Sequence, residues 1–154
     1  MSQIAPDLAR ARRTVLDLLA IPGVSGDEKA VAEHIVKTLR AAGCPASAIM
    51  FDRAHEKTPL EGNCGNLIVK LPGTKPGPRR LFMAHMDTVP VCRGAKPVVK
   101  GGFVTSADPK TGLGGDDRAG VGVVLTTALE ILGRKLPHPP LTFLFAVQEE
   151  VGLY

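Results

Sequence analysis

Two apolar segments of strand length, residues 80–84 and 141–147, constrain the fold of this chain more than any other feature of its sequence. The second has the pattern of a strand that is buried on both faces of a sheet. Residues 66–71 predict another short strand, and residues 98–105, with two glycines inside, predict a hairpin. Because the central-strand pattern lies close to the last residue, Tyr154, one side of the sheet would be an exposed edge, and we expect partner strands to lie outside this sequence.

Apolar residues at helical spacing alternate with these strands. Residues 6–20 and 117–132 each carry an apolar stripe. A further helix is expected between them, where Ser25 and Glu28 have the spacing of a capping box and Gly43 marks the end. Helices that alternate with buried strands predict an α/β fold, with a mixed, largely parallel sheet and helices on both of its faces.

Composition excludes several classes of protein. The formal net charge is +4, and the basic residues are scattered rather than interleaved with aromatic ones, so no nucleic-acid partner is expected. No apolar run approaches the ~20 residues that a membrane helix needs, and the N-terminus lacks the pattern of a signal peptide. Three cysteines without a CxxC pair are typical of reduced thiols. We therefore expect a single cytoplasmic domain without a membrane partner.

Polar side chains follow both apolar segments at the point where each strand is expected to end. His85 and Asp87 come directly after the first segment, and Glu149 and Glu150 come after the second. In open α/β sheets ligands bind beyond the carboxyl ends of the strands, so these side chains are expected at one rim. Taken separately, each pair has a plain alternative, namely a histidine near a strand end and two solvated carboxylates in a loop.

These residue types suit a metal-assisted hydrolysis. The neutral imidazole of His85 is a good ligand for zinc, cobalt or manganese, and Asp87 can accept a hydrogen bond from the ring nitrogen that faces away from the metal. Adjacent side chains of an extended chain point to opposite sides. One of Glu149 and Glu150 can therefore bind metal while the other serves as a general base.

Two more carboxylates, Asp116 and Asp117, lie at the expected start of the last helix. Alone they indicate an N-cap with an acidic first turn, which the helix dipole favours. Gly112, Gly114 and Gly115 let the backbone approach a site more closely than a cap requires, and a carboxylate can bridge two cations. Together the three motifs predict a two-metal hydrolytic site. The other histidines are not expected to be ligands: His34, His55 and His138.

The chain resembles the co-catalytic zinc peptidase family that includes peptidase T, carboxypeptidase G2 and aminoacylase. Three strings carry the resemblance, residues 84–90 (AHMDTVP), 113–120 (LGGDDRAG) and 148–153 (QEEVGL). The first string favours the peptidase T-like branch over the related glutamyl and deblocking aminopeptidases, which share the Asp-Asp-Arg and Glu-Glu-Val-Gly-Leu strings. Arg118 stands where peptidase T-like proteins usually have lysine, and the charge is kept.

The resemblance implies a role for each site residue. His85 would bind one metal ion, Glu150 the other and Asp116 both. Asp87 would orient His85, and Glu149 would take a proton from the attacking water and later give it to the leaving amine. Two divalent ions are implied, with zinc as the expected metal and cobalt or manganese as alternatives. The implied reaction is hydrolysis of a peptide bond at the N-terminus of a short peptide.

Members of this family are more than twice as long as this chain. The resemblance therefore implies that residues 1–154 form the N-terminal part of a metallopeptidase catalytic domain, with the C-terminal part and a lid or dimerisation domain outside this sequence. The third protein ligand of each metal ion would lie there too, so the isolated chain is expected to bind metal weakly and to turn over slowly. A homodimer is left open for the full-length protein. The alternative is a truncated metal-binding remnant without catalytic activity.

Overall fold

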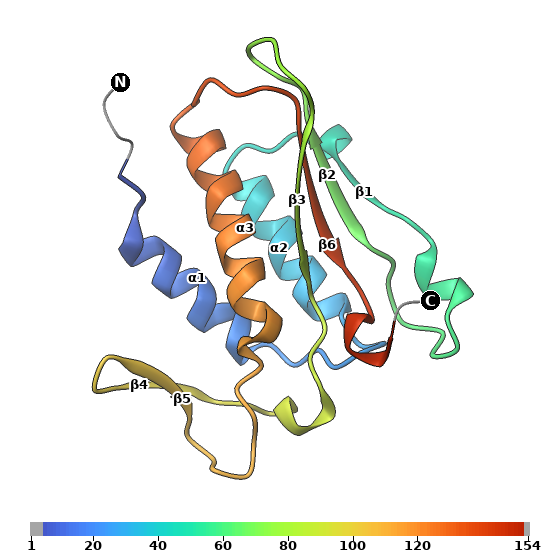
Figure 1. Ribbon diagram of the computed structural model, residues 1–154, viewed down its shortest axis with the longest axis vertical. Helices are drawn as coiled ribbons and strands as arrows, with labels where there is room; N and C mark the ends of the chain where they lie inside the picture. Colours follow the sequence, from blue (N-terminus) through green and yellow to red (C-terminus); the bar gives the residue numbers. More distant parts are fainter. Residues whose placement is uncertain (1–4, 153–154) are drawn as a thin grey trace.

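Three helices lie on one side of a four-stranded sheet (Figure 1). The computed structural model describes residues 5–152. The helices are α1 (Leu8–Ala20), α2 (Lys29–Ala41) and α3 (Gly115–Gly133). The sheet has the strand order β1 (Ile49–Phe51), β2 (Leu67–Leu71), β6 (Leu141–Ala146) and β3 (Arg80–His85). A separate hairpin is formed by β4 (Pro97–Lys100) and β5 (Phe103–Ser106).

The predicted α/β class is confirmed, and the sheet is mixed. Only the β3–β6 pair is parallel among the strands of the described sheet, whereas β1–β2 and β2–β6 are antiparallel, so the expected largely parallel sheet is corrected here. Apolar periodicity shows that a strand is buried but carries no information on its direction, and the three-residue β1 was not predicted. Residues 141–147 are not an edge of the described sheet, because β6 lies between β2 and β3, and partner strands outside this sequence stay a prediction.

One face of the sheet forms the core with the helices. Alternate residues of β2 and β6 are buried there, and Phe143 and Phe145 are fully buried. Helix residues that fill the same core include Leu18, Ile35 and Leu125. Because side chains alternate along a strand, the burial of every second residue indicates that the helices cover this face alone.

The opposite face of the sheet has no helix among residues 5–152 (Figure 1), which differs from the expected helices on both faces. Leu81 and Met83 on β3 are 60% and 62% exposed there. They lie in register with Thr142 and Leu144 of β6. An apolar run predicts that both faces of a strand are apolar, but it does not say what covers the second one. Among the described residues no helix is long and apolar enough to cross a membrane.

The register of β3 with β6 brings two chemically important chain segments together. His85, the last residue of β3, pairs in parallel with Ala146, the last residue of β6. Both strands therefore end at the same rim, as the sheet rule predicts. Helix α3 packs across β3 and begins at this rim. Its N-cap, Gly114, has φ 74° and a Cβ there would lie 2.8 Å from Thr88 Cγ2, so the position requires glycine.

Candidate metal centre

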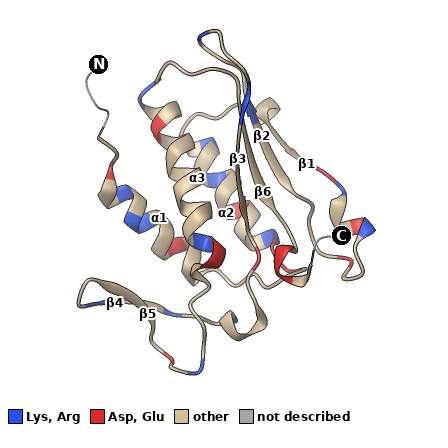
Figure 2. Cartoon of the chain, in the orientation of Figure 1, with Lys and Arg blue, Asp and Glu red and all other residues tan. Residues whose placement is uncertain are grey.

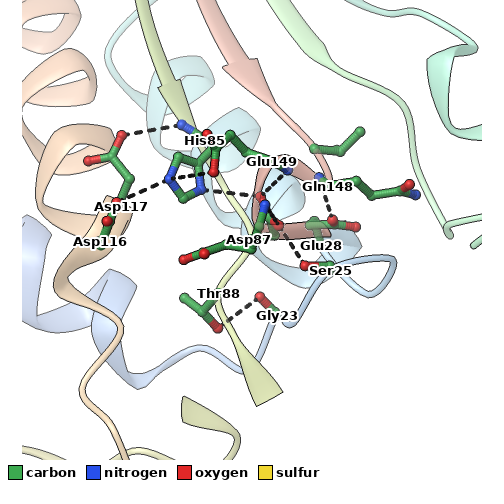
Figure 3. A network of polar contacts seen from close by, with 12 residues as sticks. Gly23, Ser25, Glu28, His85, Asp87, Thr88, Asp116, Asp117, Gln148 and Glu149 are labelled. Carbon is green, nitrogen blue, oxygen red and sulfur yellow. Dashed lines mark hydrogen bonds and ion pairs between the residues drawn. The ribbon is translucent and has the colours of Figure 1, made fainter. Parts of the chain in front are cut away.

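His85 lies between two carboxylates at the rim of the sheet (Figure 3). Its Nδ1 atom is 3.2 Å from Asp87 Oδ1, and its Nε2 atom is 3.2 Å from Asp116 Oδ1. The Oε2 atom of Glu149 lies 3.8 Å from the same Nε2. The imidazole side chain is only 11% exposed. Nδ1 therefore faces the buried carboxylate of Asp87, and Nε2 faces the exposed carboxylates of Asp116 and Glu149.

The three predicted ligands come together. One ligand atom from each of His85, Asp116 and Glu150 lies within 4.8 Å of the other two, and this is the one such cluster among residues 5–152. Asp117 does not join them. Its Oδ1 accepts a hydrogen bond from the amide of Gly120 at 2.9 Å, in the first turn of α3. The two neighbouring aspartates therefore differ in their contacts, since Asp117 accepts a hydrogen bond within the first turn of α3 and Asp116 faces the cluster.

The residue types and spacing of this cluster fit a divalent cation. Bonds from zinc to histidine nitrogen or carboxylate oxygen are about 2.0–2.2 Å long, so two ligands of one ion lie about 3 Å apart. The distance of 3.2 Å between His85 Nε2 and Asp116 Oδ1 has this size. One imidazole with two carboxylates suits zinc, cobalt or manganese. The Asp116 side chain is 87% exposed, so its second carboxylate oxygen is accessible from solvent.

Asp87 is fully buried and accepts four hydrogen bonds. Its Oδ1 faces His85 Nδ1 and accepts from the Glu149 amide at 3.0 Å. Its Oδ2 accepts from the Glu150 amide at 3.0 Å and from the Ser25 hydroxyl at 2.7 Å. This single carboxylate therefore links the imidazole to the backbone of both glutamates.

Acidic residues gather where β3 and β6 end and α3 begins (Figure 2). Burial alone lowers the pKa of His85, but the negative charge of Asp87 and the hydrogen bond to Asp116 outweigh it, so the pKa is raised. Burial also raises the pKa of Glu150, and the charge of Asp116 adds to this effect while His85 opposes it. A concentration of negative charge that perturbs its own members in this way attracts cations.

The predicted capping box does not form, although both of its residues have a defined place. Glu28 is the N-cap of α2 without a side-chain cap bond, and its Oε1 accepts from the amides of Gly26 at 2.8 Å and Gln148 at 3.0 Å. The Ser25 hydroxyl donates to Asp87 instead of to the helix. The spacing of Ser25 and Glu28 therefore predicted the wrong hydrogen-bond partners. A capping box considers only the residues at the start of one helix, whereas these side chains bind groups from other segments.

Arg118 is a buried cation directly behind the site, with 1% exposure. Its Nη1 donates to the Leu18 carbonyl and its Nη2 to the Gly23 carbonyl, both at 3.1 Å. Burial lowers its pKa to about 10. Gly23 also accepts from the amide of Thr88 at 3.1 Å. The guanidinium therefore ties the loop after α1 to the start of α3, a role that the sequence did not indicate.

The turn that carries the glutamates is not extended as expected. Gln148 has φ 57° in the left-handed region, and Glu149–Val151 form a single 3₁₀ turn. Glu149 is nevertheless exposed and Glu150 half-buried, so the two carboxylates lie in different surroundings. The division between them is therefore made by the 3₁₀ turn.

A family model described as peptidase family M28 matches residues 66–154. Among curated relatives, a probable carboxypeptidase of Emericella nidulans is 33% identical over 143 residues, which cover 88% of this chain and 30% of the relative. Peptidase T of Escherichia coli K12 is 29% identical over 121 residues, covering 57% of this chain and 30% of the relative.

Solved structures include a chain with the same arrangement of elements. A tripeptidase of Staphylococcus aureus superposes with a TM-score of 0.84 at 29% identity, over 96% of this chain and 38% of the tripeptidase. The resemblance to the peptidase T-like branch is thereby confirmed. This chain spans about a third of the length of the relatives it matches.

Proposed function

We propose that this chain, which belongs to peptidase family M28, carries the metal-binding rim of an enzyme that hydrolyses peptide bonds in short peptides. One observation supports this most directly: His85, Asp116 and Glu150 present ligand atoms within 4.8 Å of one another at the ends of the two parallel strands. The names of peptidase T and of the tripeptidase support a short peptide as substrate.

The proposed ligands divide between two divalent ions. His85 would hold one ion, Glu150 the other, and the exposed carboxylate of Asp116 would contact both. We propose zinc, with cobalt or manganese as alternatives, because the ligand set suits all three. A bound ion of this kind would polarise the scissile carbonyl and make a nearby water more acidic.

Glu149 is proposed as the general base. Its carboxylate is exposed and its Oε2 lies 3.8 Å from His85 Nε2, so it borders the ligand cluster without belonging to it. Glu149 would take a proton from the attacking water at Oε2. The water oxygen would form a bond to the carbonyl carbon, the carbon–nitrogen bond of the peptide would break, and the same Glu149 oxygen would return the proton to the leaving amine. Asp87 would keep the His85 ring in place through Nδ1.

The test uses the complete protein that contains this chain. Chelation should abolish cleavage of tripeptides with a free amino terminus, and zinc, cobalt or manganese should restore it. Glu149→Ala should lower kcat by about 10²–10⁴-fold while the bound metal is retained. Glu33→Ala, which removes an exposed carboxylate of α2, serves as the matched control and should be fully active.

Two outcomes would contradict the proposal. Cleavage that persists after the metal is removed would exclude the metal centre, and substantial activity in Glu149→Ala would remove this residue from the reaction. Peptides blocked at either end show which end is cut, because an aminopeptidase requires the free amino group. Residues 1–154 alone should bind metal more weakly than the complete protein. Homodimerisation and a cytoplasmic location stay predictions.

A further inference from the structure

Three successive backbone amides in the turn after β6 donate to two buried carboxylates (Figure 3). The amide of Gln148 donates to Glu28 Oε1, and those of Glu149 and Glu150 donate to the two oxygens of Asp87, each at 3.0 Å. Glu28 and Asp87 are both 0% exposed. The turn that carries the proposed base and a proposed ligand is therefore held by side chains from two distant segments.

The backbone of this turn needs such restraint. Gln148 has φ 57° and ψ 34°, which are left-handed values that residues other than glycine adopt at a cost. A residue in this region keeps its conformation only where the surrounding structure fixes it. Asp87 fixes the two residues that follow, whereas Glu28 binds the amide of the left-handed residue itself.

Burying the carboxylate of Glu28 costs free energy that a residue needed only for packing would not require. A buried carboxylate is less favourable than an apolar side chain of similar volume unless its partners compensate. Oε1 accepts two amides, from Gly26 and Gln148, but Oε2 has no hydrogen-bond partner among residues 5–152. An apolar residue would fill this space, but it could not accept the amide of Gln148.

We infer that Glu28 is a positioning residue for the acidic turn, and that by holding the Gln148 amide it sets the places of Glu149 and Glu150. Glu28 Oε1 accepts hydrogen bonds from the amides of Gly26 and Gln148 and from no proposed metal ligand, so it acts through the backbone. Its effects on turnover and on metal affinity depend on the proposed function, whereas its effect on the backbone of the turn does not.

The test compares two substitutions of nearly equal size. Glu28→Gln keeps a carbonyl oxygen that can accept both amides, and Glu28→Met has no acceptor. Glu28→Met should weaken metal binding and lower kcat by about 10–100-fold, the usual effect of losing a supporting partner, with little change in KM. Glu28→Gln should restore both quantities to near the wild-type values. In the metal-free protein, amide hydrogen exchange of residues 148–151 should accelerate in Glu28→Met only.

A control separates positioning from general destabilisation. Ile35→Ala creates a cavity in the fully buried face of α2 and removes no hydrogen-bond acceptor from the turn. All variants are measured well below their melting temperatures. If Ile35→Ala, destabilised as much as Glu28→Met, loses as much kcat and metal affinity, the inference is wrong. Should Glu28→Met fail to fold, Glu28→Asp takes its place, because the shorter side chain withdraws the acceptor and should show the same losses.

The remaining outcomes distinguish the two proposals. A wild-type protein that binds metal but cleaves no peptide would overturn the proposed function. Amide hydrogen exchange of residues 148–151 and metal affinity would still test the role of Glu28. A variant without the acceptor that keeps wild-type exchange at residues 148–151 and wild-type metal affinity would overturn the role of Glu28, whatever the reaction is.

Discussion

Asp87 and Asp116 face opposite nitrogens of the His85 ring at the same distance of 3.2 Å, yet the protein holds them in different ways. Asp87 is fully buried and accepts hydrogen bonds from two amides and a hydroxyl in addition to the imidazole. Asp116 is 87% exposed and contacts only the imidazole through a side-chain hydrogen bond among residues 5–152. A carboxylate that is saturated by protein donors fixes geometry, and one with free lone pairs is available to a cation.

The largest effect that tests this comparison is expected for Asp116→Ala. Removing the carboxylate that we propose to be shared should empty both metal positions, with a loss of affinity greater than the about 10–100-fold caused by a lost supporting residue. Metal analysis of the purified protein measures it. Unfolding of the metal-free protein in urea should change by no more than about 0.5 kcal/mol, because the side chain is exposed. A metal content equal to that of the wild type would contradict the comparison.

Asp87→Ala should have the opposite profile. It leaves the amides of Glu149 and Glu150 and the Ser25 hydroxyl without their acceptor in the interior. Each buried polar group that loses its partner costs about 1–3 kcal/mol, so the free energy of unfolding should fall by about 3 kcal/mol or more. Urea unfolding in the presence of a chelator measures this without a contribution from metal. Equal losses for Asp87→Ala and Asp116→Ala would remove the distinction between the two carboxylates.

Glu28 sharpens the comparison, because it is buried like Asp87 but has one oxygen without a partner in the described part of the chain. Burial raises the pKa of this carboxyl above its ordinary value. At a pH between the ordinary pKa of the unfolded chain and the raised pKa of the folded protein, the folded protein holds more protons than the unfolded chain. The free energy of unfolding therefore falls as the pH rises through the folded-state pKa. Relative to Glu28→Gln, the wild type should therefore lose stability between acidic and neutral pH. Urea unfolding at several pH values measures this. A difference in the free energy of unfolding between the wild type and Glu28→Gln that does not change with pH would contradict the raised pKa of Glu28.

The sequence located most elements because their apolar patterns are local. The stripe over residues 117–132 corresponds to α3, the apolar segments correspond to β3 and β6, and the hairpin at residues 98–105 corresponds to β4 and β5. The gathering of His85, Asp116 and Glu150 also followed from the sequence, because the carboxyl ends of parallel strands meet at one rim. Their roles as ligands stay predictions.

What the sequence did not predict depends on contacts between distant segments. The hydrogen bond between Glu28 and Gln148 joins residues 120 positions apart, so no local pattern predicts it. Ser25 and Glu28 instead have the spacing of a helix cap. Arg118 was noted only for its charge, although its guanidinium binds two carbonyl groups near the end of α1. Strand direction and the uncovered face of the sheet were missed because hydrophobicity specifies burial and not pairing.

The position of β3 at one side of the described sheet has a consequence for handling the protein. Along its outer side, the backbone N–H and C=O groups of this strand have no neighbouring strand among residues 5–152. Such an edge is a template for pairing with another chain, and the exposed Leu81 and Met83 beside it add an apolar surface. The strand that carries His85 is thus an edge of the described sheet, so pairing of this edge with another chain would take place next to the proposed metal site.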